Sequence, residues 1–219
     1  MKTHATPYGP LANIYDGFLT LTGFKRGVEN FLDRVEFELP EHAAILDAGC
    51  GTGLVSLYLA RRYPSAHITA TDIDDAMLDQ MVELAEVAGI DSARLLIAKS
   101  DLASPHAITP RGGTSRLIPE QSLDAVIVSG ALEHVGLDDS VQKLVRLIKP
   151  GGVFFNLGVR HNPAGAVLGM VYSFRPYSLA EMRSAYAKAG LHNIRALKLQ
   201  AKDFPANLSR VAVIAKKPA

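Results

Sequence analysis

Three glycines and one carboxylate lie close together in the stretch ILDAGCGTG, residues 45–53. Gly49, Gly51 and Gly53 alternate behind a short apolar run, and Asp47 precedes them. A glycine-rich turn between a strand and a helix lets a ligand approach the backbone, and the first amides of the helix then face that ligand. We therefore predict a ligand site here, with a tight turn that binds nothing as the alternative.

A second acidic residue, Asp72, ends the β-branched stretch HITATD, about 20 residues beyond the glycines. A carboxylate at this place can accept hydrogen bonds from both hydroxyls of a ribose. The alternative is that Asp72 caps the helix that begins near Asp74. Together with the glycines, this acid predicts a nucleoside cofactor.

The spacing of the glycines separates two kinds of nucleoside cofactor. In the dinucleotide pattern G-x-G-x-x-G, the third glycine would fall on Leu54 counted from Gly49, or on Ser56 counted from Gly51. The carboxylate of Asp47 would also repel a pyrophosphate, whereas it would attract a ligand with an ammonium group. The register therefore argues against a nicotinamide oxidoreductase. A binding assay that compares a nicotinamide dinucleotide with a nucleoside cofactor that carries an ammonium group would decide.

Strand-like and helix-like segments alternate through the middle of the chain. Short apolar or β-branched runs predict strands, and amphipathic segments of about 10 to 15 residues between them predict helices. The predicted strands span residues 43–49, 67–72, 93–101, 122–132 and 152–159, and the helices span 54–64, 74–89 and 141–152. This alternation is typical of βαβ units around a parallel sheet.

The end of the chain breaks this alternation. After a predicted helix, residues 192–200 and 208–217 read as two strands joined by a short turn, so they must pair antiparallel. Residues 102–122 hold three prolines and two adjacent glycines, and they predict a long loop. Residues 160–174 are largely apolar without a clear period, whereas residues 11–38 have helical spacing.

Composition limits the classes of protein to consider. The net charge is +1 and there is no basic stripe, so we expect no nucleic-acid partner. The single cysteine excludes an internal disulfide framework. Pro7, Pro10 and Asp16 interrupt any signal-peptide core, and no stretch approaches the roughly 18 apolar residues of a membrane span. We expect a cytoplasmic protein with one domain over residues 1–219.

Five stretches resemble, in order and spacing, the successive motifs of class I S-adenosylmethionine-dependent methyltransferases of the small-molecule type. They are ILDAGCGTG, TATDIDDAML, AKSDL, LDAVIVSGALEHV and LIKPGGVFF. The resemblance implies an α/β fold, a Rossmann-like three-layer sandwich whose seven-stranded, mostly parallel sheet ends in a C-terminal antiparallel hairpin. It places a helical N-terminal cap at residues 1–40 and the core at 41–219. The implied cofactor is S-adenosyl-L-methionine, with S-adenosyl-L-homocysteine as its product and no metal.

The resemblance also assigns roles to residues of the cofactor site. Asp47 and the carbonyl of Gly49 would receive the methionyl ammonium, Asp72 the ribose, and Asp101 the adenine amino group. The full implied set of cofactor-binding residues is Asp47, Gly49, Gly51, Gly53, Asp72, Ile73, Asp101, Leu102, Ser129 and Tyr15. The alternative for Asp101 is a loop cap, and that for the N-terminal segment around Tyr15 is a helix packed on the sheet.

Methyl transfer from a sulfonium is an in-line displacement, so the protein mainly places the acceptor and excludes water. A hydroxyl or thiol acceptor also needs a base. His134 follows the predicted strand 122–132 and is the candidate, with an ordinary loop histidine as the alternative.

The acceptor is predicted to be a small molecule. The chain reads SGAL at 129–132, where many enzymes that methylate base or glutamine amide nitrogens have an N-P-P-Y type of signature. If residues 164–174 form a lid, their apolar side chains favour an apolar or aromatic acceptor, whereas a plain core helix would carry no such information. Two alternatives stay open: an enzyme like the cyclopropane-fatty-acid synthases, and a non-catalytic S-adenosylmethionine-binding protein.

Overall fold

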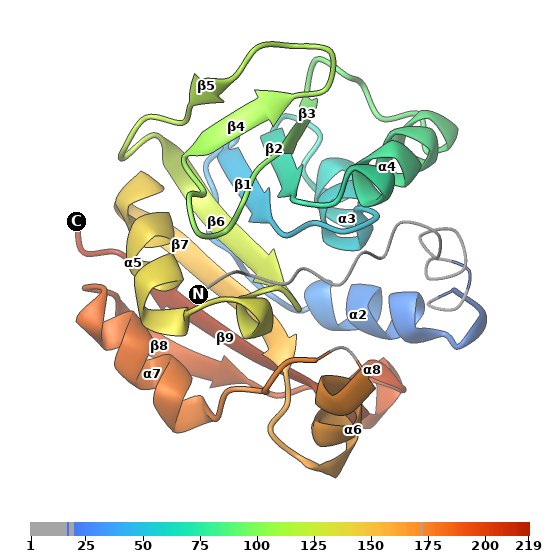
Figure 1. Ribbon diagram of the computed structural model, residues 1–219, viewed down its shortest axis with the longest axis vertical. Coiled ribbons are helices and arrows are strands. Elements are labelled where there is room, and N and C mark those ends of the chain that lie inside the picture. The colour runs from blue at the N-terminus through green and yellow to red at the C-terminus, as the bar shows by residue number, and fades with distance from the viewer. Residues whose placement is uncertain (1–16, 18–19, 172) are drawn as a thin grey trace.

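The computed structural model describes residue 17 and residues 20–171 and 173–219. Within these residues one nine-stranded sheet has the order β5-β4-β3-β2-β1-β6-β7-β9-β8 (Figure 1). The parallel strands are β1 (Ala44–Ala48), β2 (His67–Asp72), β3 (Leu95–Lys99), β6 (Leu123–Ser129) and β7 (Ile148–Val159). The antiparallel strands are β4 (Ala107–Pro110), β5 (Arg116–Leu117), β8 (His192–Leu197) and β9 (Arg210–Lys216).

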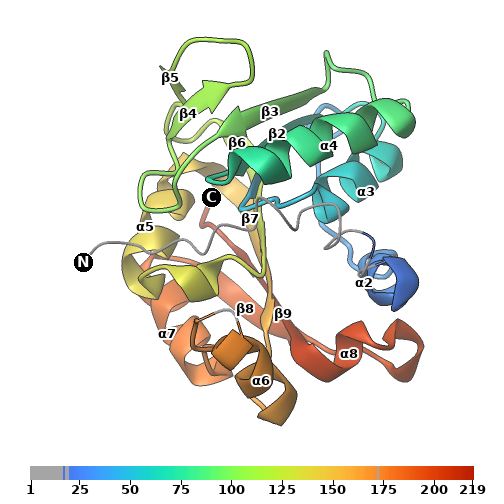
Figure 2. The same ribbon diagram turned by 45° about the vertical axis from the view of Figure 1, so that its right-hand side comes forward.

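Helices cover both faces of the sheet, which gives three layers (Figure 1, Figure 2). The helices on one face are α2 (Phe24–Leu32), α3 (Leu54–Arg62) and α4 (Asp75–Val87), and those on the other are α5 (Leu137–Leu147) and α7 (Leu179–Lys188). The shorter elements are α6 (Pro163–Val171), α8 (Ala206–Ser209), η2 (Leu132–His134) and η3 (Ala201–Asp203). None of the described helices is long and apolar enough to cross a membrane.

The central strands are apolar on both faces because both faces are covered. Ile45 of β1 packs into the α2–α3–α4 layer, whereas its neighbour Leu46 packs into the α5–α7 layer. Phe155 and Phe154 of β7 divide between the two layers in the same way. This period-2 division of continuous apolar runs is what a buried parallel sheet requires.

The predicted Rossmann-like architecture is confirmed, with more strands than the seven expected. The two additional strands, β4 and β5, come from residues 102–122, which were predicted to be a loop. β4 pairs with the free side of β3 and buries Ile108, so a segment rich in proline and glycine still closes the sheet edge. The C-terminal hairpin is confirmed by the antiparallel pairing of β8 with β9.

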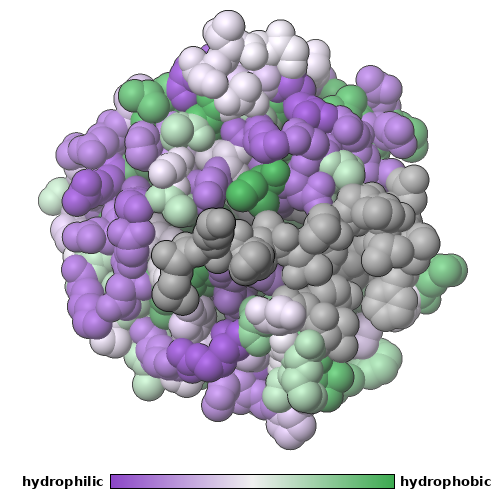
Figure 3. Space-filling model, viewed as in Figure 1, coloured by the Kyte–Doolittle hydropathy of each residue, from purple (hydrophilic) through white to green (hydrophobic). Residues whose placement is uncertain are grey.

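Two other predictions need adjustment. The helical reading of residues 11–38 is met by α2 over Phe24–Leu32, whereas residues 35–40 have no helical assignment and residues 11–16, 18 and 19 lie outside the described part of the chain. Residues 160–174 contain α6, whose Val167 and Met170 are exposed. In Figure 3 hydrophobic side chains gather over α6 and α8 at the lower edge of an otherwise largely polar face.

The topology predicts a ligand site at the carboxyl ends of the parallel strands. β1 lies between β2 and β6, so the chain leaves β1 toward one side of the sheet and later returns on the other. Open α/β sheets bind ligands in the crevice outside the strand ends at such a switch point.

Candidate functional site

A cavity of about 620 Å³ lies at these strand ends. Nine of the predicted residues line it, namely Asp47, Gly49, Gly51, Asp72, Ile73, Asp101, Leu102, Ser129 and His134. Gly53 is not among the lining residues, and a Cβ there would come within 2.8 Å of Met81 on α4. Tyr15 lies outside the described residues.

The glycine turn after β1 combines tight packing with open space. The amides of Gly49 and Cys50 donate to the carbonyl of Thr71 at 2.7 and 2.9 Å, which ties the turn to β2. A Cβ on Gly49 would stand 2.3 Å from the Cβ of Ala131. Gly51 has φ +55°, and no described atom beyond its chain neighbours lies within 4 Å of its Cβ position. The bare backbone therefore serves packing at Gly49 and leaves room for a ligand at Gly51.

Asp72 is fixed by the turn that it faces. Its carboxylate accepts hydrogen bonds from the amides of Gly51 at 2.8 Å and Asp74 at 3.0 Å. Burial raises the pKa of Asp72, while these amide bonds oppose that shift. The N-cap of α4 is Asp74, whose side chain accepts from the amide of Ala76. The helix thus has a cap other than Asp72, which stays at the cavity.

Asp47 is completely buried beneath the glycine turn. The hydroxyl of Ser56 donates to its Oδ2, whereas Oδ1 has no partner among the described residues. Burial raises the pKa of Asp47 to about 7, against the opposing effect of the Ser56 hydrogen bond. A buried carboxyl group with one free oxygen can bind a cationic group that enters the cavity.

The cavity extends over the ends of β2 and β3. Ile73 is 40% exposed and lines the cavity, as does Leu102. Asp101 lines the cavity, and its Oδ1 also accepts the amide of Ala103 at 2.8 Å. The loop-cap alternative for Asp101 is therefore met, and the same residue remains at the cavity.

The other end of the cavity lies past β6, where His134 ends η2. Its ring packs edge to face on Phe174 with centroids 4.9 Å apart. Burial lowers the pKa of His134, which favours the neutral imidazole near pH 7, the form that can accept a proton. The neighbouring Glu133 does not line the cavity; its Oε1 accepts the amide of Val159.

Sequence reasoning did not single out Arg210, which lines the cavity at the end near His134. Arg210 begins β9 and pairs with Val159 at the end of β7. Its guanidinium lies over the ring of Phe24, 5.1 Å from the centroid. Antiparallel pairing with β7 brings the start of β9 to the carboxyl edge, whereas the predicted hairpin paired residues 208–217 only with residues 192–200.

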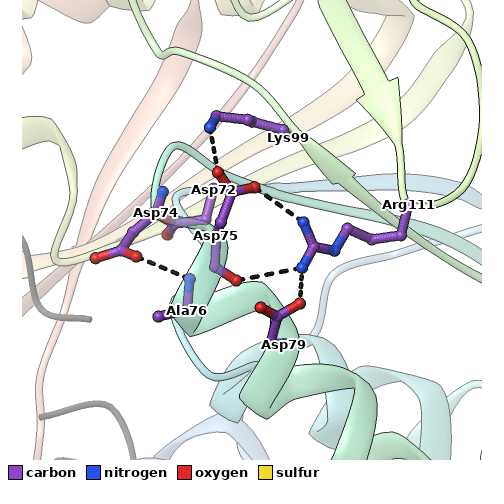
Figure 4. Close-up of polar contacts among 7 residues, drawn as sticks. All are labelled: Asp72, Asp74, Asp75, Ala76, Asp79, Lys99 and Arg111. Carbon is purple, nitrogen blue, oxygen red and sulfur yellow. Dashed lines mark hydrogen bonds and ion pairs between the residues drawn. The ribbon is translucent and has the colours of Figure 1, made fainter. Parts of the chain in front are cut away.

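An ion-pair cluster stands beside Asp72 (Figure 4). Asp75, in the first turn of α4, pairs with Lys99 of β3 and with Arg111, whose Nη1 lies 2.9 Å from Asp75 Oδ1. Arg111 also pairs with Asp79, one turn further along α4. The cluster joins the β4–β5 hairpin to the helix that follows the Asp72 loop.

Residues 45–152 of the chain match the methyltransferase domain family. The chain is 31% identical over 126 residues to an S-adenosyl-L-methionine-dependent Diels-Alderase of Talaromyces variabilis, covering 57% of this chain and 39% of that protein. It is 30% identical over 158 residues to a demethylmenaquinone methyltransferase of Leptospira interrogans, covering 69% and 58%. The chain thus spans between about two fifths and three fifths of the length of these relatives.

A solved structure shares the fold across nearly the whole chain. It contains a methyltransferase in complex with the Trm112 methyltransferase activator of Haloferax volcanii. The TM-score is 0.74 at 17% identity, with 97% of this chain and 98% of that chain covered.

Proposed function

Since the chain belongs to the class I S-adenosylmethionine-dependent methyltransferases, we propose that it transfers the methyl group of S-adenosylmethionine to a small acceptor molecule. The single observation that carries the proposal is the meeting of nine predicted residues around one cavity at the sheet's switch point. When bound, S-adenosylmethionine supplies the electrophilic methyl group and the leaving group.

The residues of the cavity fit this cofactor. Oδ1 of Asp47 is free to receive an ammonium group, and the open space over Gly51 admits a ligand against the backbone. Asp72 is held at the cavity by two amides, in a position to receive ribose hydroxyls. Ile73 offers an exposed apolar face for the adenine ring. These roles all lie on the β1–β2–β3 side of the site.

At the acceptor end, His134 is the proposed base for a hydroxyl or thiol acceptor. Its neutral form is favoured by burial, and Phe174 packs against its ring. The cavity wall also carries apolar side chains, Phe24 and Val28 of α2 and Val135, beside the guanidinium of Arg210. These side chains support an apolar or aromatic acceptor and exclude water from the transfer. One relative's name, demethylmenaquinone methyltransferase, denotes an acceptor of this kind.

A second candidate is a protein that binds S-adenosylmethionine without methyl transfer. The relative named as an S-adenosyl-L-methionine-dependent Diels-Alderase favours it, because that name couples the cofactor to a cyclisation. In this case His134 and the apolar wall would bind a substrate that is reshaped but gains no carbon. Product mass separates the candidates, since methyl transfer adds one methyl group.

The deciding experiment is transfer of radiolabelled methyl from S-adenosylmethionine into a fractionated cell extract. Asp72→Ala tests the site, and Asp139→Ala is the matched control, because Asp139 is an exposed acid on α5 outside the cavity lining and pairs with Lys143 of the same helix. We expect label in an organic-extractable fraction with wild type and Asp139→Ala, and its loss with Asp72→Ala. Label confined to protein or RNA would contradict the small-molecule acceptor. Cofactor binding without any label would favour the second candidate.

A further inference from the structure

Arg210 places a cation at the cavity, and two of its nitrogens find no acceptor in the part of the chain that the structure describes. Its Nε and Nη1 are buried and have no hydrogen-bond partner among the described residues. Arg210 is also the only lysine or arginine among the described residues that line the cavity. Leaving these buried nitrogens unpaired is costly, so they indicate a partner from outside the described part of the chain.

The guanidinium is held in place by packing. It stacks on Phe24 of α2, and Nη1 lies 2.8 Å from the position that a Cβ on Gly130 would take. Any side chain at residue 130 would therefore displace Arg210. The glycine after β6 and the aromatic ring on α2 form a cradle that keeps the charged group at the cavity wall.

The buried acid Glu133 does not pair with Arg210. Glu133 is buried and attracts Arg210 through space, but its Oε1 accepts the amide of Val159 and the two side chains form no ion pair. Burial raises the pKa of Glu133, which disfavours its charged form. The acids that line the cavity, Asp47, Asp72, Asp74, Asp75 and Asp101, belong to the β1, β2 and β3 ends of the site. The positive charge of Arg210 is thus left for a ligand.

We propose that Arg210 binds an anionic group, a carboxylate or a phosphate, on a ligand in this cavity. The guanidinium fork matches both groups with parallel charge-assisted hydrogen bonds. Two ligands of the proposed reaction, on which this inference rests, can bring such a group. One is the cofactor through its methionyl carboxylate, and the other is the acceptor, which would then combine an apolar body with an anionic head.

The first arm of the test measures cofactor binding by calorimetry. Arg210→Gln is compared with wild type and with Arg183→Gln, which removes an exposed arginine of α7 outside the cavity. The ligands are S-adenosylhomocysteine and 5′-methylthioadenosine, which lacks the carboxylate. If the cofactor provides the anion, Arg210→Gln lowers the affinity for S-adenosylhomocysteine by about tenfold or more. The affinity for 5′-methylthioadenosine stays unchanged. Arg210→Lys retains the charge and recovers part of the affinity.

The second arm titrates the protein saturated with S-adenosylhomocysteine. The probes are octanoate and octyl phosphate, each against the neutral octanol. If the acceptor provides the anion, wild type and Arg183→Gln prefer an anionic probe by about tenfold, and Arg210→Gln loses that preference. Melting temperatures confirm that the variants are folded.

The proposal is overturned if Arg210→Gln changes neither the discrimination between the two nucleosides nor the preference for anionic probes, or if wild type shows neither. A purely structural arginine would lower the melting temperature and leave both ratios unchanged. Because both arms read binding, they are independent of methyl transfer. Failure of the proposed function would appear separately, as absent label with intact nucleoside binding.

Discussion

At the scale of single residues, the protonation of Asp47 should control cofactor binding. Burial raises its pKa from 3.8 to about 7, so the free protein holds a neutral carboxyl below pH 7. An ammonium group prefers the charged form, and affinity for S-adenosylhomocysteine should therefore rise between pH 6 and about 7.5, by up to about tenfold per unit. The rise levels off above this range because Asp47 is then ionised.

Calorimetry across this range checks the prediction, with Asp47→Asn and 5′-methylthioadenosine as controls that should both give flat profiles. The linked effect on the free protein has the opposite sign. Because the native state holds the Asp47 proton more tightly than the unfolded chain, this residue's contribution to stability falls as pH rises from 3.8 to about 7. A flat affinity profile in wild type would remove Asp47 from the ammonium site.

His134 should affect turnover far more than cofactor binding. As a base at the acceptor end it would contribute about 10² to 10⁴ in rate, so His134→Ala should lower kcat by that order once an acceptor is known. Because burial lowers its pKa, the rate should fall only as pH drops below the ordinary histidine range. Steady-state kinetics from pH 5 to 8 tests this, and an unchanged kcat would show that His134 is no base.

Substitutions at two glycines of the turn should have different effects, one on stability and the other on cofactor affinity. Gly49→Ala should lower the melting temperature, because its Cβ would collide with Ala131. At Gly51 the added Cβ meets open space, so Gly51→Ala should lower the free energy of unfolding only by the roughly 1 to 2 kcal/mol that a left-handed backbone costs. The affinity for the cofactor should fall, because the added methyl group enters the cavity. Thermal melts and calorimetry on both variants make the comparison. Equal affinity in Gly51→Ala and wild type would contradict a ligand over this turn.

At the scale of elements, the β4–β5 hairpin is attached to α4 through Arg111. Exposed ion pairs each stabilise by about 0 to 1 kcal/mol, so Arg111→Ala should change global stability little. The hairpin follows the loop of Asp101, Leu102 and Pro105, which line the cavity. Loosening the hairpin by Arg111→Ala should therefore lower the affinity for S-adenosylhomocysteine several-fold. The loss should be larger at low salt, where the ion pairs are strongest.

Calorimetry at low and high salt measures this effect of the hairpin. Arg116→Ala is the matched control, since Arg116 is an exposed arginine on β5 of the same hairpin. If the two variants bind equally well, the ion-pair cluster does not position the loop.

The elements differ in how far their sequence specifies them. The strands of the parallel core are short apolar or β-branched runs, and the turn at 49–53 leaves little choice of backbone, so both were predictable. β4 is four residues long and ends in Pro110, and only pairing with β3 makes it a strand. Arg210 became a site residue through antiparallel pairing and the packing of Phe24, neither of which local sequence encodes.

At the scale of the whole molecule, the cavity gathers residues from β1, β2, β6, β9 and α2, elements far apart in the chain. A ligand that binds there bridges both halves of the sheet and binds the folded state alone. At 100 times its Kd it should stabilise the protein by about 2.7 kcal/mol, which corresponds to a rise of roughly 5 to 10 °C in Tm for a chain of this size. Thermal melts with S-adenosylhomocysteine test this, with Asp72→Ala showing little rise and Asp139→Ala the full one. A wild-type Tm that stays constant at saturating ligand would mean that the cavity does not hold this cofactor.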